Sequence, residues 1–399
     1  MHLQSDICII GNGAIGKTAA LGFAQAGLSV SLLSPPLGPE GNAGADDDWD
    51  VRVYALNHVA QNLLSSLRVW GALDASRVAA VDAMQVHGDG AQGGGQLGFD
   101  AYGARVGALA WIVEDRNLNQ ALDAALKFAP KVRSLVGRAT GMNNSGDRAT
   151  VQLENGDILE TALLVGADGG QSWVRGQCDI GLDYRSYGQR AIVTNFACSQ
   201  PHRGVAHQWF DAAQGIIALL PLPGQRVSLV WSAPDQLADV LMRESLTQLA
   251  ARLSVWAGPV LGDLSPLQPE TVKAFPLSLI RPHAITAPNV ALIGDAAHVV
   301  HPLAGHGMNL GFADVASLLK LVVERGAERE CGDARVLSRY TRSRKEDILL
   351  MQLATDGLER LFSSDFEPLR IARNLGLNLL DKLPVIKRRL ISQALGRPQ

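Results

Sequence analysis

The stretch Asp6–Gly16, DICIIGNGAIG, decides the fold of this 399-residue chain. Its apolar start predicts a buried strand, its glycines form a GxGxxG pattern, and the following Lys17–Gly27 segment predicts a helix. In a dinucleotide-binding βαβ unit the first glycine permits the turn, the second lets the backbone approach a pyrophosphate, and the third lets helix and strand pack closely. Gly11, Gly13 and Gly16 hold these three places. The pattern therefore predicts an α/β chain with a Rossmann-like nucleotide-binding domain.

The next predicted strand, Leu28–Leu33, is followed by Ser34. Dinucleotide-binding domains usually carry Asp or Glu there to bind the adenosine ribose, so Ser34 weakens that contact and leaves the pyrophosphate site intact. A second GxGxxG match, Gly88–Gly93, precedes a glycine-rich polar run and no predicted helix. Because phosphate binding needs a helix N-terminus, we expect a loop or hairpin there and one dinucleotide site in the chain.

A second informative segment is Asn289–Gly311, NVALIGDAAHVVHPLAGHGMNLG. It predicts a short strand, a Gly-Asp turn, a glycine-rich loop and a helix from about Asn309. Asp295 can accept hydrogen bonds from ligand hydroxyls, and the Gly305-His306-Gly307 backbone can approach a flat ring closely, because glycine has no Cβ. Asp168 also follows an apolar strand, Leu163–Val165, and stands beside glycines.

Two arginines stand before or within predicted helices. Arg52 precedes a predicted helix over Asn57–Trp70; taken alone it is better explained as a solvated charge. Arg116 lies in the first turn of an amphipathic helix, near the positive end of the helix dipole, where a cation is unfavourable without an anionic partner. Further along, Ala149–Leu153 and Ile158–Thr161 predict a hairpin across Asn155-Gly156.

The composition agrees with a soluble enzyme. It predicts two domains and no nucleic-acid partner, because 399 residues exceed one ordinary core and the net charge is only −3. Its 4 cysteines are scattered, which indicates reduced thiols and a cytoplasmic setting. The first residues lead directly into the nucleotide strand, so no signal peptide is expected, and no apolar run approaches the roughly 18–20 residues of a membrane span.

Four motifs in order, GNGAIG, DVRVYAL, LVGADGGQSWVR and LIGDAAHVVHPLAGHGMNLG, resemble those of the FAD-dependent aromatic hydroxylases, and within them the ubiquinone-biosynthesis branch. The resemblance extends over nearly the whole chain, including RYTRSRKEDILLMQLATDGLERLFSS near its end. It implies a Rossmann-like FAD-binding domain interleaved with a β-sheet substrate domain. It also implies that NAD(P)H reduces FAD, that O2 then forms a flavin C4a-hydroperoxide, and that an electron-rich phenol is hydroxylated in a site that excludes water.

The resemblance also assigns roles to matching positions. Gly11, Gly13 and Gly16 would hold the FAD pyrophosphate, Ser34 occupies the ribose position, and Arg52 and Arg116 would contact FAD. Asp168 would serve both FAD and the passing NAD(P)H, and Asp295 would bind the ribityl chain. The positions expected around the isoalloxazine edge are Pro302, Gly305, Gly307, Met308 and Asn309. His306 replaces the usual Gln between the loop glycines. His301 and His306 are the candidate catalytic or tuning residues, although histidines in such loops are more often structural.

Three functions fit these motifs. The first is hydroxylation of a polyprenyl phenol, which the apolar strands Gly215–Leu222 and Val227–Trp231 would suit. The second is hydroxylation of a small soluble aromatic acid. The third is a non-catalytic subunit of a quinone-biosynthesis complex, favoured slightly by Ser34 and His306. No metal site is expected, because His298, His301 and His306 lack the i, i+4 helical spacing of zinc motifs.

The predicted organisation is interleaved. Residues 1–75, 100–178 and 280–335 should form the FAD-binding domain, residues 76–99 and 179–279 the substrate domain, and residues 336–399 a helical C-terminal region. From Pro368 to Gln399 the chain has seven Lys and Arg against one Asp. A basic amphipathic end suits peripheral contact with an inner membrane or a quinone-biosynthesis complex, and it equally suits a helix packed on the FAD-binding domain with a solvated basic face.

Overall fold

The first sheet is built around β1 (His2–Ile10), the strand that precedes the glycine turn. β1 pairs in parallel with β2 and with β11, and β11 pairs in parallel with β19. The computed structural model describes residues 1–36, 49–88, 94–267, 271–301 and 306–363. The other strands of this sheet are β2 (Val30–Ser34), β8 (Val132–Val136), β9 (Ala139–Asn143), β10 (Ala149–Leu153), β11 (Ile158–Gly166), β18 (Thr286–Ala287) and β19 (Val290–Leu292).

The predicted hairpin is confirmed, because β10 and β11 pair antiparallel and Gly156 between them has a φ of +83°. Antiparallel pairing of β5 (Ala83–His87) with β6 (Gln96–Asp100) also confirms a hairpin around the second GxGxxG match. Residues 89–93 of that match lie outside the described residues. No phosphate-binding helix follows them among the described residues, because the chain continues as β6.

α1 (Ala14–Gln25) begins three residues earlier than the predicted Lys17. Gly13 is extended at its N-cap, and Lys17 N donates to Gly13 O at 3.0 Å, so the first helical turn follows the glycine directly. α2 (His58–Ser66) ends before the predicted Trp70. The chain turns at Arg68, whose φ is +60°, and Val69 N donates to Leu64 O at 2.8 Å, a helix-ending bond pattern that the apolar periodicity did not reveal.

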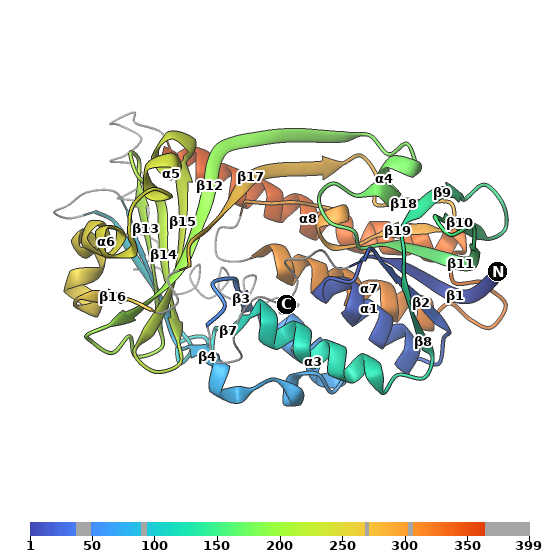
Figure 1. Ribbon diagram of the computed structural model, residues 1–399, viewed down its shortest axis with the longest axis horizontal. Coiled ribbons are helices and arrows are strands. Elements are labelled where there is room, and N and C mark those ends of the chain that lie inside the picture. Colours follow the sequence, from blue (N-terminus) through green and yellow to red (C-terminus); the bar gives the residue numbers. More distant parts are fainter. Residues whose placement is uncertain (37–48, 89–93, 268–270, 302–305, 364–399) are drawn as a thin grey trace.

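Helices pack on the first sheet and on each other: α1 contacts β1 and β2 as well as α3 and α7 (Figure 1). α7 begins at His306, three residues before the predicted Asn309. The remaining helices, with 3-10 turns labelled η, are η1 (Trp70–Ala72), η2 (Ala75–Arg77), α3 (Asp115–Lys127), α4 (Trp173–Gln177), α5 (Asp235–Leu241), α6 (Leu246–Leu261), η3 (Gly294–Ala296), α7 (His306–Val323) and α8 (Ala334–Ser363).

The second sheet is mainly antiparallel and carries the predicted apolar strands as β14 and β15. On one face Trp231, Leu229 and Ile217 pack against α5 and α6. On the other face Ala206, Leu220 and Leu222 pack toward the rest of the molecule. Besides β5 and β6, its strands are β12 (Leu182–Cys198), β13 (Val205–Asp211), β14 (Gly215–Leu222), β15 (Arg226–Pro234), β16 (Leu264–Pro266) and β17 (Lys273–Pro282).

A small sheet joins the two larger ones, with β7 (Ala110–Glu114) between β3 (Val53–Leu56) and β4 (Val78–Val81). The long strands β12 and β17 run from the second sheet toward the first (Figure 1). The α/β class with more than one sheet and a helical region toward the C-terminus is confirmed. The domain boundaries stay a prediction, and the basic segment Pro368–Gln399 lies outside the described residues.

Candidate cofactor site

The predicted site residues gather at one edge of the first sheet. β1, β2, β11 and β19 run parallel, so their carboxyl ends meet at the same edge. Gly11 follows β1, Ser34 ends β2, Asp168 follows β11 and Asp295 follows β19. In open parallel sheets this edge is where ligands bind. Four segments that are far apart in the sequence therefore contribute to one place.

The glycine turn combines tight packing with open space. A Cβ on Gly11 would lie 2.2 Å from Ala167 O, and one on Gly16 would lie 2.0 Å from Gly11 O. A Cβ on Gly13 would meet nothing within 4 Å, although Gly13 is the N-cap of α1 and no side chain caps it. Gly11 and Gly16 are therefore needed for packing, whereas Gly13 presents the start of α1 to open space, as a bound phosphate requires.

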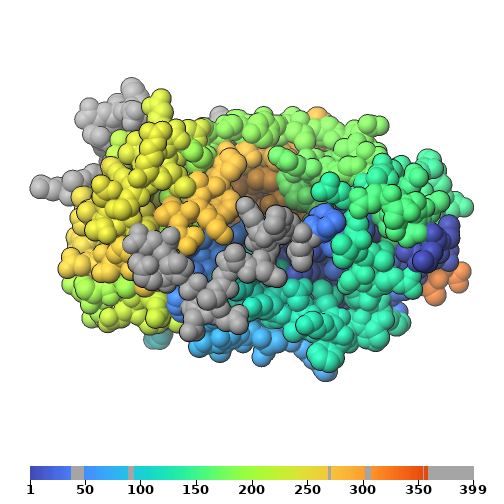
Figure 2. Space-filling model, viewed as in Figure 1, coloured from blue at the N-terminus to red at the C-terminus, as the bar shows by residue number. Residues whose placement is uncertain are grey.

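Asp295 stands beside this turn. Ile15 of α1 lies 3.4 Å from where a Cβ on Gly294 would be and 2.9 Å from one on Gly311, so α1, η3 and α7 meet here. The Asp295 side chain is solvent-accessible, yet desolvation by the surrounding protein raises its pKa, while His298 and Arg52 oppose the rise. Accessibility together with desolvation indicates a recessed position. The face in Figure 2 is hollowed near its middle, where orange residues lie deep between yellow and green surface.

Arg52 approaches the same place from the segment before β3. Its guanidinium lies 5.6 Å from the ring centres of both Tyr54 and Phe275, the latter on β17 of the second sheet. Burial alone would lower its pKa, but Tyr54, Asp115, Asp295 and Asp50 raise it overall. Among the described residues no carboxylate forms an ion pair with Arg52. Its charge is therefore held where an anionic ligand can use it.

Asp168 has partners within the protein. Its carboxylate accepts hydrogen bonds from Ser172 Oγ at 2.5 Å and from Val174 N at 3.0 Å, at the start of α4. The buried Arg175 of α4 donates to Gly170 O at 2.7 Å and to Ala296 O at 3.0 Å. These bonds fix the end of β11 against η3, so the Asp168 motif shapes the edge next to Asp295. A direct contact of Asp168 with cofactor stays a prediction.

The two described histidines of the Asn289–Gly311 segment have separate partners. His298 Nε2 lies 2.7 Å from Asp314 Oδ2, and Asp314 also accepts from Arg344 Nε at 2.8 Å and from Gly294 N at 2.9 Å. His301 is fully buried, with Nε2 3.2 Å from Gln189 Oε1 on β12. Burial lowers the pKa of His301 to about 4, so its ring is neutral at pH 7. It is suited to orienting groups and not to carrying a charge.

The remaining predicted positions lie at the start of α7. Gly307 has no atom within 4 Å of an added Cβ, and Met308 packs partly against the core. The Asn309 side chain accepts from Asn57 N at 2.9 Å and donates to Ala55 O at 2.8 Å, so it ties α7 to the β3–α2 junction. Pro302 and Gly305 lie outside the described residues, as does the side chain of His306.

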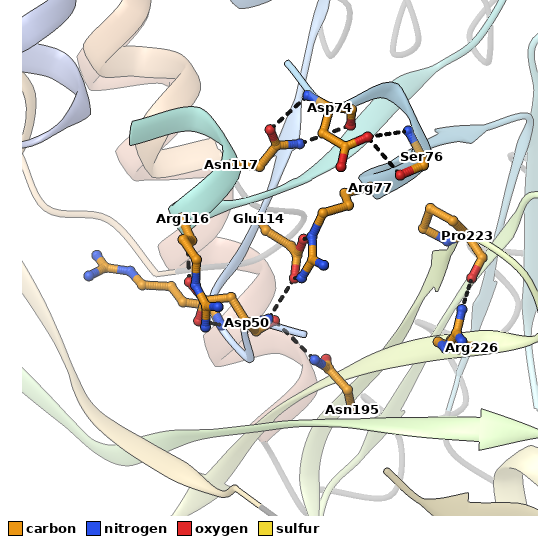
Figure 3. A network of polar contacts seen from close by, with 11 residues as sticks. Asp50, Asp74, Ser76, Arg77, Glu114, Arg116, Asn117, Asn195, Pro223 and Arg226 are labelled. Atoms are coloured by element: carbon orange, nitrogen blue, oxygen red, sulfur yellow. Dashed lines mark hydrogen bonds and ion pairs between the residues drawn. The ribbon is translucent and has the colours of Figure 1, made fainter. Parts of the chain in front are cut away.

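Two polar groups of this region were missed by sequence reasoning. Asp50 accepts hydrogen bonds from the backbone N–H groups of Arg52 and of Arg116, the second of which is drawn in Figure 3. Tyr54 donates to Asp115 Oδ1 at 2.7 Å. The available signal was an acid close before each arginine, Asp50 before Arg52 and Asp115 before Arg116. The buried Asp314–Arg344 pair offered no such signal, because the two residues are 30 positions apart.

Comparison with known proteins agrees with this geometry. A family model described as an FAD binding domain matches residues 121–349. The chain is 34% identical over 395 residues to ubiquinone hydroxylase UbiL of Rhodospirillum rubrum, covering 98% of this chain and 90% of UbiL. It is also 34% identical over 399 residues to the 3-demethoxyubiquinol 3-hydroxylase of Escherichia coli, covering 98% of each.

Solved structures share the fold. The Pseudomonas aeruginosa PqsL complex with 2-aminobenzoylacetate superposes with a TM-score of 0.76 at 22% identity, covering 94% of this chain and all of PqsL. A single-residue variant of Klebsiella pneumoniae HpxO complexed with FAD gives a TM-score of 0.75 at 19% identity, with 100% of both chains covered. From the family match and the two full-length relatives, the chain belongs to the FAD-dependent aromatic hydroxylases, in the family that includes the ubiquinone-biosynthesis monooxygenases.

Proposed function

We propose that this protein hydroxylates an aromatic ring of a ubiquinone precursor, a polyprenyl phenol, with FAD as cofactor and NAD(P)H and O2 as co-substrates. The observation that carries the proposal is that Gly11, Ser34, Asp168 and Asp295 meet at one sheet edge in a chain 34% identical, nearly end to end, to two ubiquinone hydroxylases. The names of these two relatives describe hydroxylases of ubiquinone biosynthesis, whose substrates are hydrophobic quinone precursors. We extend that substrate class to this chain.

The residues present fit FAD. The open space at Gly13 and the start of α1 suits its pyrophosphate, and the accessible carboxylate of Asp295 suits the hydroxyls of its ribityl chain. Arg52 and Arg116 would offset its negative charge, and the adenosine ribose would lie near Ser34. The isoalloxazine would lie against the segment that contains Pro302, Gly305, Gly307, Met308 and Asn309. FAD, when bound, would supply the redox chemistry between NAD(P)H and O2.

The protein's own contribution is orientation and exclusion of water. The face of the second sheet that looks toward the small sheet carries Ala206 and Leu220 in an apolar core cluster, and the register places the buried Ser228 and Asn195 on the same face. Gln208 shares this face by strand alternation and is 5% exposed. An apolar surface with few polar groups suits a prenylated ring and keeps bulk water from a reactive oxygen. Neutral His301 would orient its neighbours there, and a tuning role for His306 stays part of the proposal.

Purified protein tests the proposal directly. We expect the apoprotein to take up FAD and turn yellow, and to oxidise NADPH or NADH faster when a 2-polyprenylphenol is added. Conversion must yield one added hydroxyl by mass spectrometry. A higher rate with a soluble hydroxybenzoate would favour the small-acid reading. A colourless protein that cannot be reconstituted would contradict the enzyme readings.

The quinone precursor that accumulates in a deletion strain then identifies the ring position. A protein that only organises other enzymes would restore quinone synthesis even when its own FAD site is disabled. The enzyme proposed here would not.

We further propose that the basic segment Pro368–Gln399 attaches the protein to an anionic membrane surface, where a prenylated substrate resides. No helix in the described ranges is long and apolar enough to cross a membrane. Deleting residues 368–399 should reduce co-sedimentation with vesicles that contain anionic lipid and leave FAD content unchanged. Equal partitioning of the full-length and shortened proteins would refute attachment through this segment.

A further inference from the structure

Asp50 holds both arginines of the candidate site by their backbone. Its Oδ1 accepts from Arg52 N at 3.0 Å. Its Oδ2 accepts from Arg116 N at 3.2 Å (Figure 3). The two arginines belong to different elements, the segment before β3 and the first turn of α3. One carboxylate therefore fixes the starting points of two long cationic side chains relative to each other.

The bond to Arg116 also caps a helix. Glu114 is the N-cap residue of α3, and its side chain makes no capping bond. Asp50 supplies that bond from 66 positions away in the sequence. A carboxylate at this end of a helix is favourable and offsets the unfavourable place of the Arg116 charge near the positive end of the dipole. The structure thus explains how a cation can be kept in the first turn of α3.

Asp50 itself is held from two further directions. Its N–H donates to Glu114 Oε1 at 2.5 Å, and Glu114 is 1% exposed and paired with Arg77 at 2.6 and 3.0 Å. Its carbonyl accepts from Asn195 Nδ2 at 2.9 Å, on β12 of the second sheet. Backbone and side chain of Asp50 are therefore fixed by the small sheet, by α3 and by the second sheet together.

We propose that Asp50 is a positioning residue for FAD, which orients Arg52 and Arg116 toward the negative charge of the cofactor without itself touching it. This inference rests on the proposed function, because the arginines act on FAD only if FAD binds at this edge. The carboxylate accepts from two backbone N–H groups and, among the described residues, forms no ion pair with Arg52, so it fixes the backbone from which both arginines extend. Pre-ordered side chains bind an anion more tightly than side chains that must be ordered on binding.

The test measures the FAD dissociation constant of apoproteins, together with the apoprotein melting temperature. Asp50→Ala removes both acceptors and should weaken FAD binding about tenfold or more, whereas Asp50→Asn keeps one acceptor and should weaken it by about threefold. Asp74→Ala is the matched control, because Asp74 also accepts from a nearby backbone N–H, that of Ser76, but holds neither arginine. It should leave FAD affinity within about twofold of wild type.

A second readout separates positioning from general loosening. Affinity that depends on arginine contacts falls as salt rises, because salt screens the charges. Asp50→Ala should therefore show a shallower salt dependence of FAD affinity than wild type. If wild type binds FAD and Asp50→Ala binds it equally tightly with the same salt dependence, Asp50 has no positioning role. If wild type binds no FAD at all, the proposed function falls and this inference falls with it.

Discussion

Two carboxylates that meet at Gly294 have opposite environments. Asp314 is fully buried, and its oxygens accept from His298, Arg344 and the N–H of Gly294. Asp295, the next residue after Gly294, is accessible to solvent and forms no hydrogen bond or ion pair with the described residues. The first carboxylate stabilises the protein and the second is kept available. At this turn, a carboxylate that stabilises the fold (Asp314) therefore lies close to a carboxylate that is available to a ligand (Asp295).

The largest effect on stability is expected from a substitution of the buried carboxylate, Asp314. Asp314→Asn removes the buried counter-charge of Arg344 and should lower the free energy of unfolding by about 3 kcal/mol or more. Asp347→Asn is the matched control, because Asp347 is the other, exposed partner of Arg344 and should contribute less than about 1 kcal/mol. Urea unfolding measures both. Similar losses for the two variants would show that the buried carboxylate stabilises the protein no more than the exposed one.

His301 lies between Asp295 and Asp314 in the sequence, and its titration tests whether this stretch contributes to stability. Burial lowers its pKa from 6.5 to about 4 in the folded protein. Between these pH values the histidine is protonated in the unfolded chain and neutral in the folded protein. The contribution of His301 to the free energy of unfolding is therefore fully present above about pH 6.5 and is lost as the pH falls. The full contribution of this pKa shift to the free energy of unfolding is about 3 kcal/mol. His301→Gln should flatten the fall in stability between pH 6.5 and pH 4.

The quantity to compare is the difference in the free energy of unfolding between wild type and His301→Gln over that pH window. His207 also has its pKa lowered to about 4, by burial first and then by His87, so it contributes to the same fall in both proteins. Parallel curves for wild type and His301→Gln would show that His301 does not titrate with unfolding.

The smallest effect on stability is expected from a substitution of the accessible carboxylate, Asp295. Desolvation raises the pKa of Asp295 in the folded protein, so stability falls as the pH rises from the unfolded pKa of 3.8 to the raised folded pKa, and the full cost is present at pH values above both. Asp295→Asn should leave the apoprotein unchanged or stabilise it by less than about 1 kcal/mol at pH 7. Its FAD affinity should nevertheless fall about tenfold, because a charged acceptor for ribityl hydroxyls is lost. Calorimetry and FAD titration of one preparation give both values, and a large loss of stability would place Asp295 with Asp314.

Sequence reasoning predicted the parts of this site that are local. Strand, glycine turn and helix at Gly11–Gly16 follow from residues that are close in the chain, and so does the turn at Asp295. It could not predict the start of α7 at His306, because a glycine-rich loop has no apolar periodicity to mark the boundary. It also missed Asp50 and Asp314, whose partners Arg116 and Arg344 are brought close only by the completed fold.

The pairing order of the first sheet has a consequence for synthesis on the ribosome. β1 pairs with β11, in which His2 is opposite Ile158, and β11 must then receive β19 at Val290–Leu292. Such distant pairings form late, because the intervening chain has to be made and ordered first. The glycine turn is among the first segments to emerge, yet its ligand edge is incomplete until about three quarters of the chain has been translated. A nascent chain stalled before β19 would therefore expose the apolar edge of β11 and have no means of retaining a cofactor.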